Sequence, residues 1–335
     1  MRSNRISLWK ETFIFLIFGV IVFSFMVAEY IEIPFEISKT WLNAGTIFLS
    51  IVLEALPFIF LGVFASALIQ TFVSESTVQK WIPKNPLIAI VPVALLSALF
   101  PVCECAIIPV VRRLIKKGMP LHLGVILIIG APILNPIVFA STYYAFQSTP
   151  GIAYARMILA FILAIIIGIV VFLCYRNTNQ LKWTTTEFVD SHVKMVNAKN
   201  NSKLKILLFN STDEFFDMGK YLIFGTILAS LFQTFFNRET LVSLASSDIV
   251  SPLVMMGLGF ILSLCSEADA FVASSFAHTF STGSLLAFLL FGPMLDLKSS
   301  FMLFAYFKFK FVIGYMVIVT VSVYAVILIF QHFIL

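Results

Sequence analysis

Charge is what this sequence has least of. Only 12% of its 335 residues are Asp, Glu, Lys or Arg, whereas 60% are hydrophobic, and the mean hydropathy is +1.01. An ordinary soluble domain carries about 25% charged residues, so this composition excludes a soluble globular fold. No basic stretch is interleaved with aromatic residues, which excludes nucleic acid as an expected partner. The composition predicts an all-α membrane protein that crosses the lipid bilayer several times.

Three further absences narrow the class of protein. No GxxxxGK[ST] phosphate-binding loop occurs, so ATP hydrolysis by that route is not expected. The four cysteines all lie within or at the end of apolar runs, which argues against an extracellular disulfide framework. No histidine lies near Cys103 or Cys105 in sequence, which disfavours an intramembrane enzyme with a cysteine nucleophile. We therefore expect a transporter rather than an enzyme, with no cofactor.

Apolar runs long enough to span a membrane define the expected topology. They cover residues 12–31, 43–73, 121–145, 152–175, 216–236, 285–306 and 309–334. Two more runs, 87–111 and 250–277, are each interrupted by a cluster of Cys and Glu, and we interpret them as re-entrant segments. With a cytoplasmic N-terminus, this arrangement leaves only Lys39, Arg156 and Arg238 of the 22 basic residues outside. The sequence thus predicts about seven spanning helices and two re-entrant segments in the cell membrane.

The chain contains an internal repeat. Glu54–Phe72 aligns without a gap with Asp217–Phe235, so that Gly62 falls on Gly225. Cys103 then falls next to Cys265, and the following Gly-Pro stretches also correspond, each with a slip of one residue. An odd number of crossings separates the equivalent helices, so we expect the repeats to be inverted, as in many transporters.

The repeat divides the chain into four parts. They are an N-terminal transmembrane helix (1–42), a first repeat with a following helix (43–175), a cytoplasmic linker (176–212) and a second repeat with a C-terminal helix (213–335).

Two cysteines flank a glutamate in the first interrupted run. Pro101 predicts a non-helical start, and in an extended segment Cys103 and Cys105 would point to the same side. Thiolates select soft ions such as Cu(I), Zn(II) or trivalent arsenic, and Glu104 is costly at membrane depth unless it is functional. The alternative is that these cysteines only pack, which is our interpretation of the isolated Cys174.

The second interrupted run carries a matching cluster that contains Cys265, Glu267 and Asp269. Inverted symmetry would bring Cys265 towards the first two thiols and create a three-thiol metal site, with Glu104 and Glu267 as charge partners or proton acceptors. The alternative is that Glu267 and Asp269 pair with a lysine and only stabilise the turn.

Two polar residues lie beside prolines inside other apolar runs. Asn135 lies between Pro132 and Pro136, and Asp296 follows Pro293. Discontinuous helices of this kind build substrate sites in transporters, although a purely structural kink is an alternative.

Proton coupling has its own candidates. Glu54 and Asp269 are carboxylates within apolar surroundings, and Glu54 is preferred to its repeat equivalent Asp217. Asp217 lies three residues before Lys220, close enough for a helical ion pair.

At these residues the chain resembles the ArsP-like predicted permeases. FPVCECAIIPVVRRLIKKGMPLHLGVILIIGAPILNP resembles the first signature of that family, and LCSEADAFVASSF followed by GPMLDLK resembles the second. The resemblance covers most of 47–310 and implies a polytopic permease of the cytoplasmic membrane, in a family that includes efflux permeases for trivalent organoarsenicals. The motif residues that it implies are Cys103, Glu104, Cys105, Asn135, Cys265, Glu267, Asp269 and Asp296.

The expected function is therefore a secondary transporter that exports a thiophilic metal or metalloid, such as a trivalent arsenical. The alternative is a membrane subunit of a multi-component permease for a divalent metal or another small solute. The expected partners are the lipid bilayer, a small ion or metalloid as substrate, and an accessory subunit or further copies of the chain.

Overall fold

The computed structural model describes residues 39–72, 87–100, 102–176, 180–182, 203–235 and 249–333. Within these ranges the regular structure is α-helical, and the only β contact is an isolated bridge between Leu181 and Phe307. The helix expected at 12–31 and most of the linker lie outside the described residues.

The described helices follow the same order twice: one long helix, four short helices and a 25-residue helix. The first series is α2 (Lys39–Phe72), α4 (Ile90–Ser97), α5 (Glu104–Lys116), α6 (Leu121–Gly130), α7 (Pro136–Ala145) and α8 (Gly151–Tyr175). The second series is α10 (Lys203–Phe235), α12 (Val250–Leu262), α13 (Ser266–Ser275), α14 (Thr282–Met294), α15 (Leu297–Tyr306) and α16 (Phe309–Phe333). This order agrees with a duplication, and the inverted relation of the two halves stays a prediction.

Several of these helices are long and apolar enough to cross a membrane. Within the described ranges five stretches qualify, at Lys39–Ile69, Gly151–Tyr175, Glu214–Phe235, Thr282–Tyr306 and Phe309–Phe333. They coincide with five of the seven expected spans, so the protein is a multi-pass membrane protein. The expected spans at 121–145 and 285–306 are not continuous helices, because the chain leaves the helix between α6 and α7 and between α14 and α15. Pro136 then occupies the first turn of α7, where its missing N–H costs nothing.

The interrupted runs also form pairs of short helices, α4 with α5 and α12 with α13. Cys103 is extended and lies in the break between α4 and α5, immediately before α5. Residues 263–265 form the break between α12 and α13. The breaks expected at the Cys/Glu clusters are therefore present. Their re-entrant path through the membrane stays a prediction.

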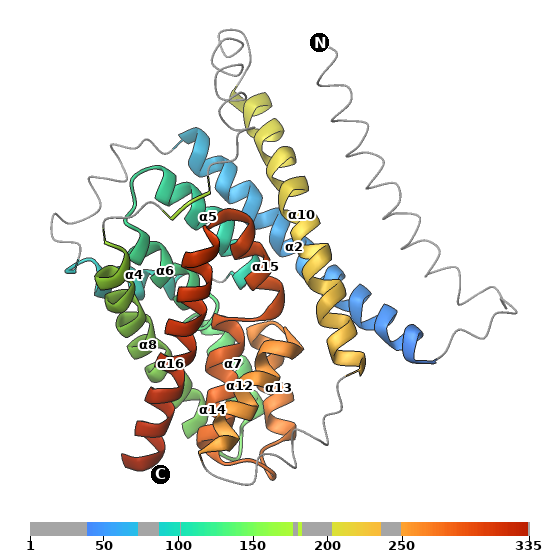
Figure 1. Cartoon of the computed structure of the whole chain (residues 1–335), viewed down its shortest axis with the longest axis vertical. Coiled ribbons are helices and arrows are strands. Elements are labelled where there is room, and N and C mark those ends of the chain that lie inside the picture. The colour runs from blue at the N-terminus through green and yellow to red at the C-terminus, as the bar shows by residue number, and fades with distance from the viewer. Residues whose placement is uncertain are drawn as a thin grey trace, which may run out of the picture.

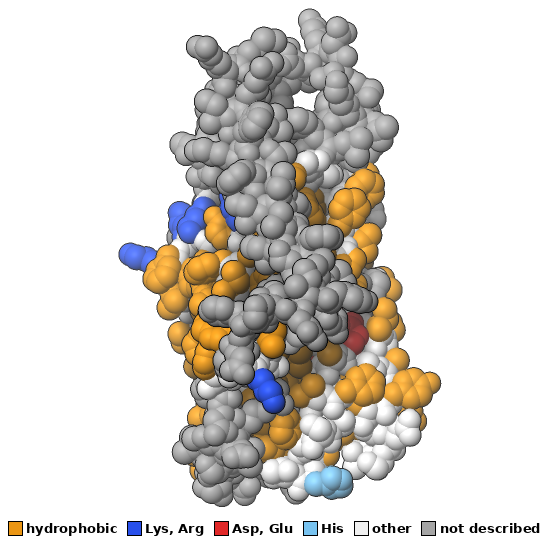
Figure 2. Space-filling view, turned by 90° about the vertical axis from the view of Figure 1, so that its right-hand side faces the viewer, with side chains coloured by type: hydrophobic (Ala, Val, Ile, Leu, Met, Phe, Trp, Pro, Cys, Tyr) orange, Lys and Arg blue, Asp and Glu red, His pale blue; other side chains and the backbone are white. Residues whose placement is uncertain are grey.

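The long helices surround a central group of short ones. Figure 1 shows α2 and α10 side by side along one flank, while α8 and α16 lie together on another, and both pairs are in contact. The 18-residue apolar window of the α14–α15 stretch is 89% buried, against 28–44% for the other four candidate spans, so this stretch forms the centre. On the face drawn in Figure 2 the described surface is mostly hydrophobic, as expected of a surface in contact with lipid.

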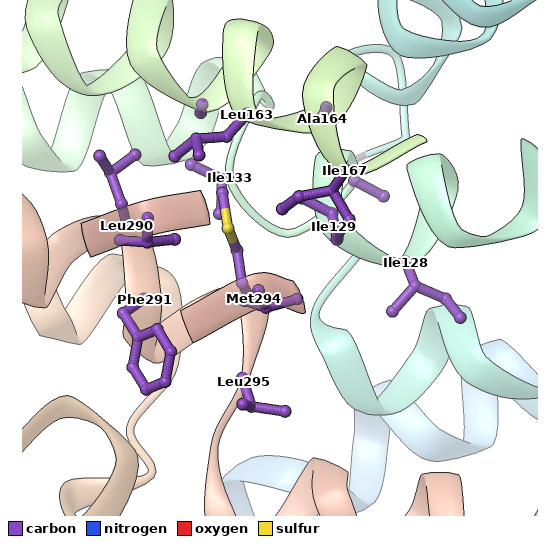
Figure 3. Packing of buried hydrophobic residues seen from close by; sticks show 14 of the residues in the cluster. Ile128, Ile129, Ile133, Leu163, Ala164, Ile167, Leu290, Phe291, Met294 and Leu295 are labelled. Carbon is purple, nitrogen blue, oxygen red and sulfur yellow. The ribbon is translucent and has the colours of Figure 1, made fainter. Parts of the chain in front are cut away.

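The face of α14 that packs towards α6 and α8 is apolar. Met294 and Leu290 of α14 lie opposite Ile129, Ile133 and Leu163 in the space between α6 and α8 (Figure 3). This dry packing holds the helix breaks on either side of it in fixed positions.

Two aligned glycines bring the long helices close to the short ones. A Cβ atom on Gly62 of α2 would lie 2.5 Å from the carbonyl oxygen of Ala106 in α5. A Cβ atom on Gly225 of α10 would lie 3.0 Å from the Cα atom of Lys298 in α15. In each half, the absence of a side chain at this glycine therefore allows the long helix to pack closely against a short helix that starts at a break.

We expect Gly62→Ala to destabilise the protein. The new methyl group meets backbone atoms that have no room to move, and overpacking of this kind costs about 1–3 kcal/mol. Gly257→Ala in α12 is the matched control, since nothing lies within 4 Å of a Cβ atom there. Thermal unfolding of the purified protein in detergent measures the difference, and equal melting temperatures of the two variants would contradict the close approach of α2 and α5.

Candidate functional site

Two short helices are capped by cysteines. Cys103 precedes α5 with φ −73° and ψ 168°, and Cys265 precedes α13 with φ −80° and ψ 156°, so both residues are extended. Cys105 already belongs to α5, and its thiol lies close enough to that of Cys103 to form a hydrogen bond. The predicted proximity of the Cys103 and Cys105 thiols is therefore present.

Two other short helices are capped by the polar residues that follow the prolines. Asn135 Oδ1 accepts a hydrogen bond from the backbone N–H of Val138 at 2.9 Å, at the start of α7. Asp296 Oδ1 accepts one from the backbone N–H of Ser299 at 2.6 Å, at the start of α15. Both residues thus satisfy a donor that a helix start leaves free, and both occupy the predicted breaks.

A buried ion cluster joins the two halves of the chain. The ammonium of Lys298 in α15 lies 2.9 Å from Glu104 Oε1 of α5 and 3.4 Å from Asp296 Oδ2. It also donates a hydrogen bond of 2.9 Å to the carbonyl oxygen of Ser263. Lys298, Glu104 and Asp296 are 5%, 3% and 0% exposed. Charges buried this deeply are costly unless they are paired, so we take this cluster as the centre of the candidate site.

A second buried cation lies near the start of α13. Arg156 of α8 is fully buried and donates hydrogen bonds of 2.6 Å to Thr142 Oγ1 and 3.1 Å to the carbonyl oxygen of Ser266. Its charge acts on the carboxylates of Asp269 and Glu267. Asp269 is buried, and neither of its carboxylate oxygens has a hydrogen-bond partner within the described part of the chain.

Glycine makes room for this carboxylate. Asp269 Oδ2 lies 3.1 Å from the position that a Cβ atom on Gly292 of α14 would take. Asp269 is also within electrostatic reach of the first cluster, because Glu104, Lys298 and Asp296 all act on it. The two groups of charges are therefore close enough to influence each other.

The expected three-thiol metal site is not assembled in this structure. Across the described residues, no three His, Cys, Asp or Glu side chains are grouped so that they could hold a metal ion. Cys265 interacts instead with Glu54 of α2, whereas Cys105 is affected by the charge of Lys298 in α15. The thiols of Cys105 and Cys265 therefore lie near different neighbours.

The expected charge partners also differ. Glu104 pairs with Lys298 rather than sharing a site with Glu267. No lysine pairs with Glu267 or Asp269 in the described part of the chain, where Arg156 is the basic residue that acts on both. Asp217 forms the predicted ion pair with Lys220.

Sequence reasoning missed the two buried cations. The count of basic residues assigns Lys298 to the cytoplasmic side and Arg156 to the outer side, and it does not predict that both are buried inside the protein. A usable signal was present, since each is an ionisable residue inside a largely apolar run, and such residues usually have a buried partner.

Two arginines near the C-terminal end of α5 also contact a buried glutamate. Glu214 of α10 is buried and accepts hydrogen bonds from Ser66 Oγ at 2.8 Å and from Arg113 Nη2 at 3.3 Å. Arg112 Nη1 lies 3.8 Å from Glu214 Oε1, and its guanidinium stacks 4.2 Å from the centre of the Tyr306 ring. This network ties α2, α5, α10 and α15 together near the C-terminal end of α5.

Comparisons of the sequence show to which family the chain belongs. Residues 40–332 match a family described as predicted permeases. The chain belongs to this family. The permease is 45% identical over 287 residues to UPF0718 protein YcgR of Bacillus subtilis, covering 85% of this chain and 96% of the relative.

A second relative carries a more specific name. The permease is 38% identical over 276 residues to a putative two-component membrane permease complex subunit of Streptococcus mutans, covering 82% of this chain and 90% of the relative. No solved structure matches the permease. Permease family membership favours transport over enzymatic activity.

Proposed function

We propose that this chain is a membrane permease that exports a thiophilic metal or metalloid, such as a trivalent arsenical, between its two halves. The observation that carries the proposal is the buried cluster of Glu104, Lys298 and Asp296 at the helix breaks. Charges are retained at such depth when they contact a substrate or a coupling ion, because their burial otherwise costs stability.

The balance of charge supports a cationic solute. Glu104, Asp296 and Asp269 are buried carboxylates, whereas Lys298 and Arg156 are the buried cations that act on them. Glu54 and Glu267 add two half-buried carboxylates at the same breaks. An excess of negative charge in a low-dielectric interior is relieved by binding a cation or a proton. Glu54 and Asp269 remain the proposed proton-coupling residues.

The thiols support a soft cation. Cys103 and Cys105 lie together next to the ion cluster, and thiolates bind soft ions more tightly than hard ones. The proposed substrate path also includes Glu267, Asn135 and Cys265. Of these, Cys265 lies beside Glu54. Cys265 would bind the solute at a different point along the path, and it would not act as a third ligand in the site formed by Cys103 and Cys105.

A multi-component permease is the second candidate. The name of the Streptococcus mutans relative supports it, because that protein is described as one subunit of a two-component complex. On this interpretation the permease described above needs an accessory subunit for activity, and the purified chain alone would not transport.

Transport by the purified chain in liposomes tests the proposal. We expect uptake of a thiophilic ion, chosen from a panel of Cu(I), Zn(II) and trivalent arsenicals, and a loss of uptake in Cys103→Ser and Cys105→Ser. A hydroxyl is a poor ligand for a soft ion, and losing about 1.4 kcal/mol of binding already lowers affinity about ten-fold. Cys174→Ser is the control, because Cys174 is exposed at the end of α8. Equal transport by all three variants would remove the thiols from the substrate path.

A further inference from the structure

Three oxygen atoms from separate segments surround the Lys298 ammonium. They are Glu104 Oε1 at 2.9 Å, the Ser263 carbonyl oxygen at 2.9 Å and Asp296 Oδ2 at 3.4 Å. The ammonium donates a hydrogen bond to the Ser263 carbonyl and forms ion pairs with the two carboxylates. Carboxylate and carbonyl oxygens grouped in this way are also the ligands that small hard cations prefer.

Asp296 and Ser263 are held in place by helix ends as well as by Lys298. Asp296 is fixed by the backbone N–H of Ser299 at 2.6 Å and by Ser263 Oγ at 2.8 Å. Ser263 ends α12 in the left-handed conformation with φ 52°, and it is the only non-glycine residue with positive φ in the described part of the chain. Such a conformation is strained for serine and persists only where surrounding contacts impose it, often at functional sites. Asp296 and Ser263 therefore have contacts besides the Lys298 ammonium that keep them in position.

The cage has more ligand capacity than Lys298 uses. Glu104 is 3% exposed, and its Oε2 atom has no hydrogen-bond partner among the described residues. Two carboxylates also face one ammonium, so the group carries a net negative charge. A buried ligand atom without a partner is costly and points to a molecule that binds there.

We propose that Glu104, Asp296 and the Ser263 carbonyl form a binding site for a small, singly charged cation, and that Lys298 is a tethered occupant which the cation displaces. The site would then never be empty, because two buried carboxylates without a cation would cost several kcal/mol. The transported or coupling ion would enter in exchange for the ammonium. This identification of the natural occupant rests on the proposed function, whereas the existence of the site does not.

The test removes the tethered ammonium and supplies a free one. In the purified full chain, Lys298→Ala opens space for a small primary ammonium ion, and propylammonium chloride is the probe. Binding to the folded state alone raises stability with ligand concentration, so we expect a saturable rise in the melting temperature of about 3 °C or more in Lys298→Ala. The wild type, whose cage is occupied, should show no such rise at equal ionic strength.

Lys298→Met is the matched control, because it fills the volume of the lysine stem without a charge. It should not respond to propylammonium, whereas a response equal to that of Lys298→Ala would show non-specific binding and overturn the proposal. Should Lys298→Ala fail to fold, the double variant Glu104→Gln with Lys298→Ala leaves Asp296 and Ser263 as ligands and one carboxylate fewer to neutralise. We expect propylammonium to stabilise this double variant too. If propylammonium stabilises neither variant, the proposed site is wrong. Because the assay involves no transport, its outcome is separate from that of the liposome experiment.

Discussion

Replacing Arg156 with methionine should lower the free energy of unfolding by about 3–5 kcal/mol, the usual cost of leaving a buried charge without a compensating one. The change leaves Asp269 and Glu267 without the cation that acts on both of them. It also removes the donors to Thr142 Oγ1 and to the Ser266 carbonyl oxygen. The loss of protein yield and of melting temperature in detergent measures the effect.

Arg176→Met provides the control within the same stretch of chain. Arg176 follows α8 and is exposed, with its guanidinium 5.1 Å from the centre of the Phe172 ring. Substitutions at such positions usually change stability by no more than about 0.5 kcal/mol. Arg156→Lys should fall between the two, since it keeps the charge but not the two directed hydrogen bonds. If Arg156→Met is no worse than Arg176→Met, the buried position of Arg156 is wrong.

Asp296→Ala should be the most damaging change in the second half of the chain, at about 3–5 kcal/mol. One carboxylate caps α15, accepts a hydrogen bond from Ser263 Oγ and neutralises Lys298. These contributions share a single group, so their separate costs do not add. Transport should be lost together with stability, because the cation cluster is broken.

Asp296→Asn separates the cap from the charge. Asparagine is as good a helix cap as aspartate, and Asn135 already fills the equivalent position at the start of α7. We therefore expect Asp296→Asn to keep the α15 cap and to recover part of the lost stability, while transport stays impaired. Asn135→Ala, in turn, should cost about 1 kcal/mol, the usual cost of a lost cap. Full transport by Asp296→Asn would show that the charge at this position is not used.

The helix breaks were predictable because their causes are local. Proline lacks an N–H donor, and a polar residue beside it can cap the next helix, so the breaks at Asn135 and Asp296 could be predicted from sequence. The apolar runs likewise predicted five spans that the described helices contain. Each of these features depends on neighbours within one turn of the chain.

The identity of the contacts across the interior was not predictable in the same way. Aligning the repeats placed Cys265 opposite Cys103, but it did not say that Cys265 would face Glu54 of α2. Counting basic residues by membrane side placed Lys298 on the cytoplasmic side and Arg156 on the outer side, because that rule contains no information on burial. Both cations interact with carboxylates more than a hundred positions away in the chain, and their partners are fixed only by the packing of the two halves.

The ion pair between Glu104 and Lys298 also constrains how the protein is made. Glu104 enters the membrane with the first half of the chain, long before its partner in the second half exists. At synthesis rates of 5–20 residues per second, the delay is about 10–40 s. During that interval the carboxylate has to be protonated, solvated or sheltered by the insertion machinery, since an unpaired charge is unstable in hydrocarbon. The nascent first half is therefore the form most exposed to membrane quality control, and slower translation of the second half would lower the yield of mature protein.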